Sequence, residues 1–90
     1  MKKAYFIWSD YDRCYLTYNE PTDNPFYYPC CFETPDGAEK FLKKEYRNLY
    51  KLDDKVEMAG VITLTFKKIE RVNTYVMPLM KFLIVERDLL

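Results

Sequence analysis

Near the start of the chain, large apolar side chains occupy both faces of a predicted strand. In the segment "KKAYFIWS", Tyr5 and Ile7 fall on one face of an extended strand and Phe6 and Trp8 on the other. Because both sets are large, the pattern is typical of a strand covered on both faces or nearly so. Turn residues follow in "DYDR", and "CYLTY" then predicts a return strand. The sequence therefore predicts an N-terminal hairpin.

A helical period replaces this alternation from about residue 35. Thr34 can cap a helix, Pro35 suits the first helical position, and Asp36 favours the positive helix end. Apolar side chains then recur at helical spacing, at Ala38, Phe41, Leu42, Tyr46 and Leu49. We expect a helix over about 35–51, ended by a turn at "KLDDK".

Strand patterns return in the second half of the chain. In "VITLTFKKIE", apolar side chains alternate with Thr63, Thr65 and Lys67, which predicts a half-buried strand with a polar outer face. Residues 79–90 fit either a strand or a short helix after Pro78. Their β-branched centre favours a strand, from about Lys81 to Arg87.

The order strand, strand, helix, strand, strand predicts an α+β fold. We expect residues 1–90 to form a single small domain, in which one helix packs on one face of an about four-stranded, mainly antiparallel sheet. An exposed edge strand could pair two copies, so both a monomer and a homodimer through a sheet edge are compatible with this fold.

The amino-acid composition limits the partners and the cellular location that we expect for the chain. Lysine plus arginine and aspartate plus glutamate both total 14, which removes the overall positive charge of a dedicated nucleic-acid binder. Three cysteines are an odd number without the spacing of a secreted disulfide scaffold, so we expect a reducing, cytoplasmic location. The longest apolar runs fall far below the roughly 20 residues that span a bilayer, so no membrane partner is expected.

Several chemistries lack the residues they need. The chain has no histidine and only two glycines, which excludes His-assisted nucleophiles, imidazole zinc sites and glycine-rich phosphate loops. Cys14, Cys30 and Cys31 supply three thiols where structural zinc needs four ligands. Turn chemistry accounts for Asp10 and Asp12. We expect no catalysis, metal or cofactor, with an enzyme using carboxylates or Cys31 as a third possibility.

Two groups of residues are candidates for binding. Exposed tyrosines on a stiffened loop suit a protein interface, although the same rings could simply cover an open sheet end. This aromatic group comprises Phe26, Tyr27 and Tyr28 in the proline-rich loop, with Tyr11 in the first turn. A basic stripe could bind an anion or nucleic acid, or could be an ordinary solvated face. It comprises Lys40, Lys44, Arg47 and Lys51, with Lys67 and Arg71.

The function expected from these patterns is binding. We expect a small non-catalytic protein that acts through protein–protein contact, such as an inhibitor or adaptor of the kind that phages and mobile elements encode. The alternative is a nucleic-acid or phosphate-ligand binding module that uses the basic helix face.

Overall fold

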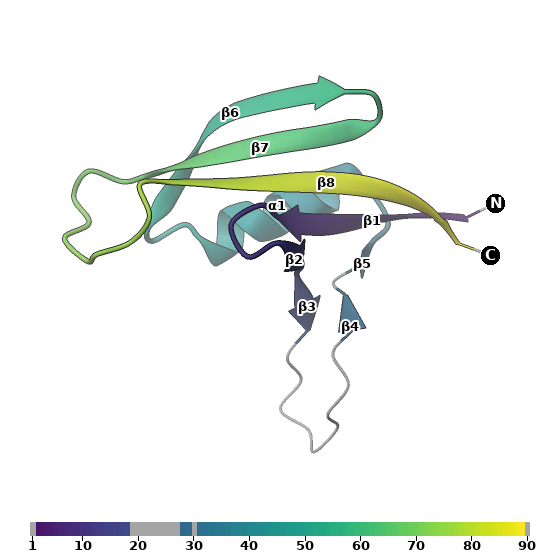
Figure 1. Cartoon of the computed structure of the whole chain (residues 1–90), viewed down its shortest axis with the longest axis horizontal. Helices are drawn as coiled ribbons and strands as arrows, with labels where there is room; N and C mark the ends of the chain where they lie inside the picture. Colours follow the sequence, from purple (N-terminus) through teal and green to yellow (C-terminus); the bar gives the residue numbers. More distant parts are fainter. Residues whose placement is uncertain (1, 19–27, 30, 90) are drawn as a thin grey trace, which may run out of the picture.

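In the main sheet, the first long strand of the chain pairs with the last. The computed structural model describes residues 2–18, 28–29 and 31–89. Within these residues the elements are β1 (Lys2–Ser9), β2 (Cys14–Tyr15), β3 (Thr17–Tyr18), β4 (Tyr28–Pro29), β5 (Cys31–Phe32), α1 (Pro35–Glu45), β6 (Tyr50–Met58), β7 (Val61–Lys68) and β8 (Leu79–Leu89). The strand order is β2-β1-β8-β7-β6, and β5 also pairs with β1, so the first long strand lies beside the last (Figure 1).

The α+β class and the mainly antiparallel sheet are confirmed, whereas the predicted strand count and order are wrong. The main sheet has six strands, all paired antiparallel, and β3 and β4 form a separate two-stranded sheet. The N-terminal hairpin is present, since Trp8 pairs with Tyr15 and Ser9 with Cys14. The extra strands come from short segments around the hairpin and from β6.

Helix α1 begins where the sequence predicts and ends earlier. The Thr34 side chain accepts a hydrogen bond of 3.1 Å from the Gly37 N–H, which satisfies one free donor of the first turn. The helix stops at Glu45 instead of about 51, and a turn follows in which the Tyr50 N–H donates to the Tyr46 carbonyl at 2.8 Å. Tyr50 is buried and its hydroxyl donates to the Met77 carbonyl at 2.7 Å. We attribute the early end to these tertiary contacts, which outweigh the weak local preference for helix.

Strand β6 occupies the segment where we predicted a helix end and a turn. A bulge between Leu52 and Asp54 bends it, and the residues beyond pair in order with β7. Ala59 and Gly60, with φ of 52° and 77°, form the two-residue turn of this hairpin. The C-terminal segment is a strand, β8, as the β-branched pattern favoured.

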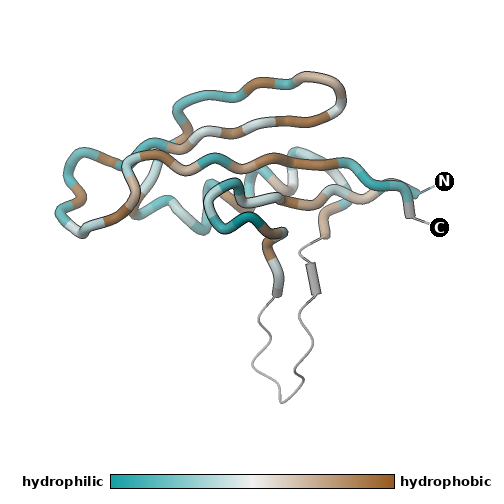
Figure 2. Tube along the Cα trace, viewed as in Figure 1, coloured by the Kyte–Doolittle hydropathy of each residue, from teal (hydrophilic) through white to brown (hydrophobic). Residues whose placement is uncertain are grey.

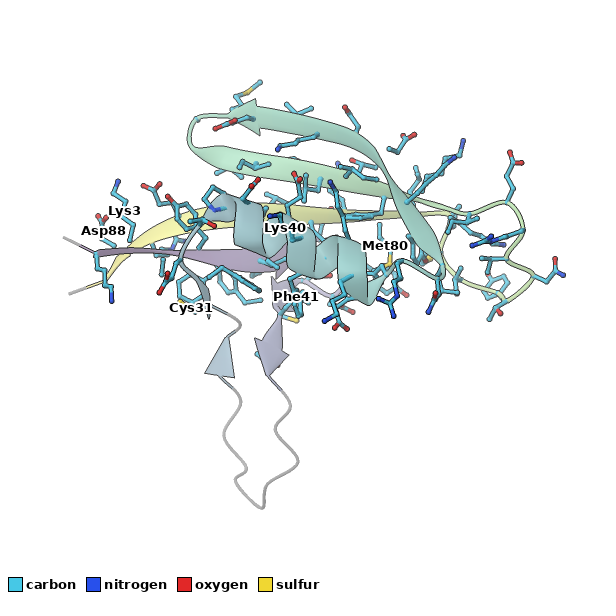
Figure 3. The ribbon with its side chains drawn as sticks, turned by 180° about the vertical axis from the view of Figure 1, so that it is seen from behind. Lys3, Cys31, Lys40, Phe41, Met80 and Asp88 are labelled. Atoms are coloured by element: carbon cyan, nitrogen blue, oxygen red, sulfur yellow. The ribbon has the colours of Figure 1, made fainter. Side chains whose placement is uncertain are left out.

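The core lies between the main sheet and α1. It comprises Ile7, Ala38, Leu42, Tyr50, Leu64, Phe66, Phe82 and Ile84. The helix lies behind the sheet in Figure 1 and in front of it in Figure 3, so it covers one face of the sheet. Phe6 and Trp8 alternate with Ile7 along β1 and therefore lie on the opposite face, outside this core. Residues 4–9 of β1 are all buried or partly buried, and Ala4, on the same face as Phe6 and Trp8, is 1% exposed. Both faces of β1 are therefore at least partly covered, as the pattern predicted, although among the described residues α1 lies only on the face of Ile7.

Candidate binding surface

The sheet face opposite α1 carries two rows of mostly apolar side chains, and we call it the open face. Strand pairing places the members of each row side by side across the sheet. One row is Val56, Thr63, Leu83, Trp8 and Tyr15, and the other is Met58, Val61, Val85, Phe6 and Cys31. None of these residues belongs to the core or to the side chains packed against it. Apolar positions continue along the centres of β1, β7 and β8 in Figure 2.

Three aromatic rings hold one another in place on the open face. The Trp8 and Tyr15 rings meet edge to face with centroids 5.0 Å apart, and the Phe6 and Tyr15 rings do so at 6.1 Å. Arg87 Nη2 donates to the Tyr15 hydroxyl at 3.1 Å. All three rings are partly buried. These contacts restrict the conformations open to the three side chains.

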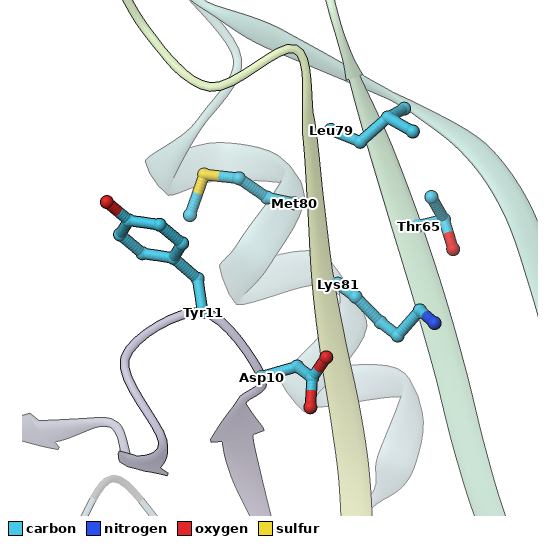
Figure 4. A pocket seen from close by; sticks show the side chains of 6 residues that line it. All are labelled: Asp10, Tyr11, Thr65, Leu79, Met80 and Lys81. Atoms are coloured by element: carbon cyan, nitrogen blue, oxygen red, sulfur yellow. The ribbon is translucent and has the colours of Figure 1, made fainter.

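A pocket of about 330 Å³ lies at one end of the open face, beside the turn between β1 and β2. It is lined by Asp10, Tyr11, Thr65, Leu79, Met80 and Lys81 (Figure 4). The Asp10 N–H donates to the Lys81 carbonyl at 3.1 Å, which ties the turn to β8. Tyr11 is 60% exposed and Leu79 53% exposed. The pocket therefore has an apolar rim that solvent reaches.

Of the predicted aromatic residues, the structure places Tyr11 at this pocket. Tyr28 lies in β4, where it pairs with Tyr18 of β3, and its side chain is outside the described part of the chain. Phe26 and Tyr27 also lie outside the described residues. Their role in partner binding stays a prediction. The sequence pattern signalled Phe6 and Trp8 as apolar, but it could not tell which apolar face of β1 would receive the helix.

The predicted basic stripe is divided by the early end of α1. Lys40 and Lys44 lie exposed on the helix, Arg47 follows in the turn, and Arg71 lies in the connection between β7 and β8. Lys51 lies on β6 and Lys67 on β7. The stripe as predicted therefore does not form one continuous helix face.

Lys51 and Lys67 are instead direct cross-strand neighbours on the open face. Lys81 lies diagonally from Lys67, since Lys67 pairs with Leu79 two positions earlier on β8. Like charges placed opposite each other destabilise a sheet. Among the described residues, none of the three lysines forms an ion pair. They make a small positive area beside the pocket.

On the α1 side of the sheet, one carboxylate joins the helix to β6. Glu39 contacts Lys43 at 3.1 Å on the same helix and Lys55 at 2.9 Å on the strand, with its side chain 13% exposed. The contact with the Lys55 ammonium is the main reason why the pKa of Glu39 lies below its ordinary value of 4.5. These contacts position β6 relative to the helix.

A second carboxylate joins the two terminal strands. Glu86 on β8 accepts from Lys3 Nζ at 2.7 Å and from the Tyr5 hydroxyl at 3.1 Å. The hydrogen bond from Lys3, followed by that from Tyr5, lowers the pKa of Glu86 below 4.5. The bond to Glu86 raises the pKa of Tyr5 above 10.0, with burial adding to the shift. The contacts are exposed or partly buried and hold the sheet where both chain ends lie.

The first turn uses its acidic side chains locally, as predicted. Asp12 Oδ2 accepts from the buried Ser9 hydroxyl at 3.0 Å, and the Asp12 N–H donates back to that hydroxyl at 3.2 Å. Asp10 forms an ion pair of 3.0 Å with Arg13. These bonds stabilise a turn in which Arg13 has a φ of 57°.

The remaining candidate chemistry is sparse. Within residues 2–18, 28–29 and 31–89, no group of three or more Cys, Asp or Glu side chains lies together as metal ligands would. Cys14 and Cys31 are free, exposed thiols. The described helix, α1, is too short to cross a membrane.

Comparison with known proteins gives no relative for this chain, since no protein-family model, curated protein or solved structure matches it.

Proposed function

We propose that this chain is a small non-catalytic protein that binds another protein through its open face, with Tyr11 and Leu79 at the rim of the contact. The observation that carries the proposal is the second apolar face of the main sheet. A two-layer α+β fold needs one apolar sheet face for its core, and here Phe6, Trp8 and Leu83 supply another on the side away from the helix. Exposed apolar patches are a common feature of interaction sites, and among the described residues α1 lies on the opposite face of the sheet.

The composition of this face supports a protein partner. Aromatic side chains and methionine are enriched in the centres of protein interfaces, and rings with few rotatable bonds give large contact area at low entropic cost. Val56 and Met58, at the β6 end of the two rows, are 43% and 72% exposed. Val56 and Met58 lie at one end of the two rows, and Trp8 and Tyr15 lie at the other end of the first row. A partner that covered all four residues would remove apolar surface from water across the whole width of the sheet.

An inhibitor or adaptor role in the cytoplasm fits these features. Such proteins act by occupying a surface and need no reacting groups of their own. The exposed thiols of Cys14 and Cys31 suit a reducing compartment.

Site-directed photo-cross-linking in native cells tests the proposal. A photoreactive phenylalanine analogue would replace Tyr11 or Val56 on the open-face side, and Lys44 on α1 as the matched exposed control. We expect a discrete protein adduct from the first two positions and none from the control. A partner identified in this way should lose binding to a Val56→Glu variant of unchanged melting temperature. Equal adducts from all three positions, or unchanged binding by Val56→Glu, would remove the open face as the site.

A second candidate, binding of nucleic acid or a phosphate ligand, is favoured by one observation. Lys51 and Lys67 lie directly opposite each other, with Lys81 diagonal to Lys67, and the aromatic rows lie on the same face. Lysines beside aromatic rings suit stacking of single-stranded bases. Binding of single- and double-stranded oligonucleotides should then fall steeply with salt and weaken in Lys67→Glu, while Lys44→Glu serves as the control. Weak, salt-insensitive binding would reject this candidate.

A further inference from the structure

Strand β6 forms an edge of the main sheet, with β7 as its neighbour on the inner side. In Figure 1 it lies at the top of the molecule, and none of the described strands pairs with its outer side. The Lys55 N–H donates to the side chain of Asp54, Oδ1, at 2.9 Å. This donor is therefore satisfied locally instead of by a neighbouring strand. An edge of this kind is open to pairing with another chain.

The bulge divides β6, and the part beyond it has a regular alternation. Lys55 pairs with Leu64 and Glu57 with Ile62, so both charged side chains lie on the α1 side of the sheet. Asp54, Val56 and Met58 lie on the open face. In a hairpin closed by a two-residue turn, hydrogen-bonded pairs alternate with non-hydrogen-bonded pairs, starting from Met58 and Val61. The peptide groups of Lys55 and Glu57 then point away from β7, in agreement with the Asp54 contact.

We propose that a second copy of this chain pairs with β6 in antiparallel orientation, about a two-fold axis at Val56. In this arrangement Lys55 of each copy lies opposite Glu57 of the other, and their outward peptide groups exchange hydrogen bonds. Val56 lies opposite Val56 of the other copy on the open face. The charge pattern is therefore self-complementary, which is the feature that points to a second copy as the occupant of this edge.

The same charges disfavour the neighbouring registers. A shift that moves the axis to Lys55 places Lys55 opposite Lys55, and a shift to Glu57 places Glu57 opposite Glu57. Like charges directly opposite each other are unfavourable in a sheet, whereas opposite charges are favourable. On the N-terminal side of Asp54, the bulge reverses the faces on which successive side chains lie, so the regular ladder ends there. One register of about five residues from each copy is thus selected.

Pairing changes two contacts within each copy. The Lys55 N–H exchanges Asp54 Oδ1 for a backbone carbonyl of the other copy. The Lys55 ammonium, which already contacts Glu39, gains a second carboxylate in Glu57 of the other copy. Because so short a ladder buries much less than the roughly 1,200 Å² of a standard interface, the dimer is weak and forms only at high protein concentration. This inference does not rest on the partner-binding role of the open face.

Charge-swap variants test the inference by sedimentation equilibrium from about 10 µM to about 1 mM, where small interfaces associate. The wild-type chain should shift toward the dimer mass as concentration rises. Lys55→Glu places two glutamates opposite each other, and Glu57→Lys places two lysines opposite each other. Each variant alone should associate at least about tenfold more weakly than the wild type. An equimolar mixture of the two should regain association, because the charges are again complementary in the mixed dimer.

Two further variants distinguish pairing through the β6 edge from association through the open face. Glu57→Pro removes an outward N–H without removing a bond to β7, so it should abolish association while the melting temperature stays near that of the wild type. Tyr11→Ser should leave association unchanged. A wild-type chain that remains monomeric throughout the range would overturn the inference. A dimer that persists in both charge variants, or a mixture that stays monomeric, would do so as well.

Discussion

Among the described residues, α1 covers one face of the main sheet and the open face stays partly exposed, and two identical substitutions on neighbouring central strands test this difference. Leu64 on β7 is 0% exposed and lies in the core. Leu83 on β8 is partly buried on the open face, between Thr63 and Trp8. Replacing each leucine with alanine removes the same atoms from two different environments, so the difference in unfolding free energy reports the cover on each face.

The expected magnitudes differ because only one site leaves a cavity. Leu64→Ala should lose about 3 kcal/mol, from the transfer of the removed atoms and the cavity that the rigid core cannot close. At Leu83 water can fill the vacated space, so only part of the transfer free energy is lost, about 1 kcal/mol. The difference of about 2 kcal/mol corresponds to roughly 8–16 °C in melting temperature for a domain of this size.

The assay is urea and thermal unfolding followed by far-ultraviolet circular dichroism. Both variants should unfold in one transition, with the melting temperature of Leu83→Ala about 4–8 °C below that of the wild type and that of Leu64→Ala lower still. Fluorescence of the single tryptophan, Trp8, should change in Leu83→Ala, because Trp8 is its cross-strand neighbour. If Leu83→Ala costs as much as Leu64→Ala, the open face is covered in solution and the proposed binding surface is refuted.

Three further predictions concern the turn, the pH dependence and the aromatic loop. Ala59→Asn should stabilise the chain by about 0.5–1 kcal/mol in urea unfolding, since Asn before Gly60 tolerates the positive φ of this hairpin turn better than alanine; an unchanged or lower midpoint would contradict this reasoning. The lowered pKa of Glu39 means that its ion pairs stabilise the fold above pH 4.5 and that this part is lost as the pH falls through the folded-state pKa. The difference in unfolding midpoint between wild type and Glu39→Gln should therefore shrink below pH 4.5, and a constant difference would exclude this linkage. Serine at the three ring positions of the proline-rich loop should keep the melting temperature within a few degrees and abolish partner binding, whereas a large loss of stability would show that the rings belong to the core. These positions are Phe26, Tyr27 and Tyr28.

Local chemistry explains which parts of the fold could be predicted. The start of α1 depends on Thr34, Pro35 and Gly37, which lie within one turn of each other, so capping alone locates it. The strand pattern of residues 62–67 and the β-branched centre of β8 are likewise visible in short windows. In the candidate site, the sequence analysis named Tyr11 of the first turn, and its role in binding stays a prediction. It did not name Leu79 and Lys81 for this site, because they reach the same pocket only through the pairing of distant strands.

The pattern of residues is enough to show that β1 has two apolar faces and that one helix with one apolar stripe follows the first hairpin. One apolar helix stripe can cover only one sheet face. Because both faces of β1 carry large apolar side chains, the sequence pattern does not show which face the helix covers. The face that receives the helix follows from long-range pairing. Strand β8, more than 70 residues away in the chain, pairs with β1 and aligns Ile7 with Ile84 under the helix and Phe6 with Val85 on the open side. Tertiary contacts also ended α1 at Glu45 and released the residues of β6 to form the sheet edge. Such pairings depend on the summed burial of many side chains distant in sequence, and no short window of residues contains that sum.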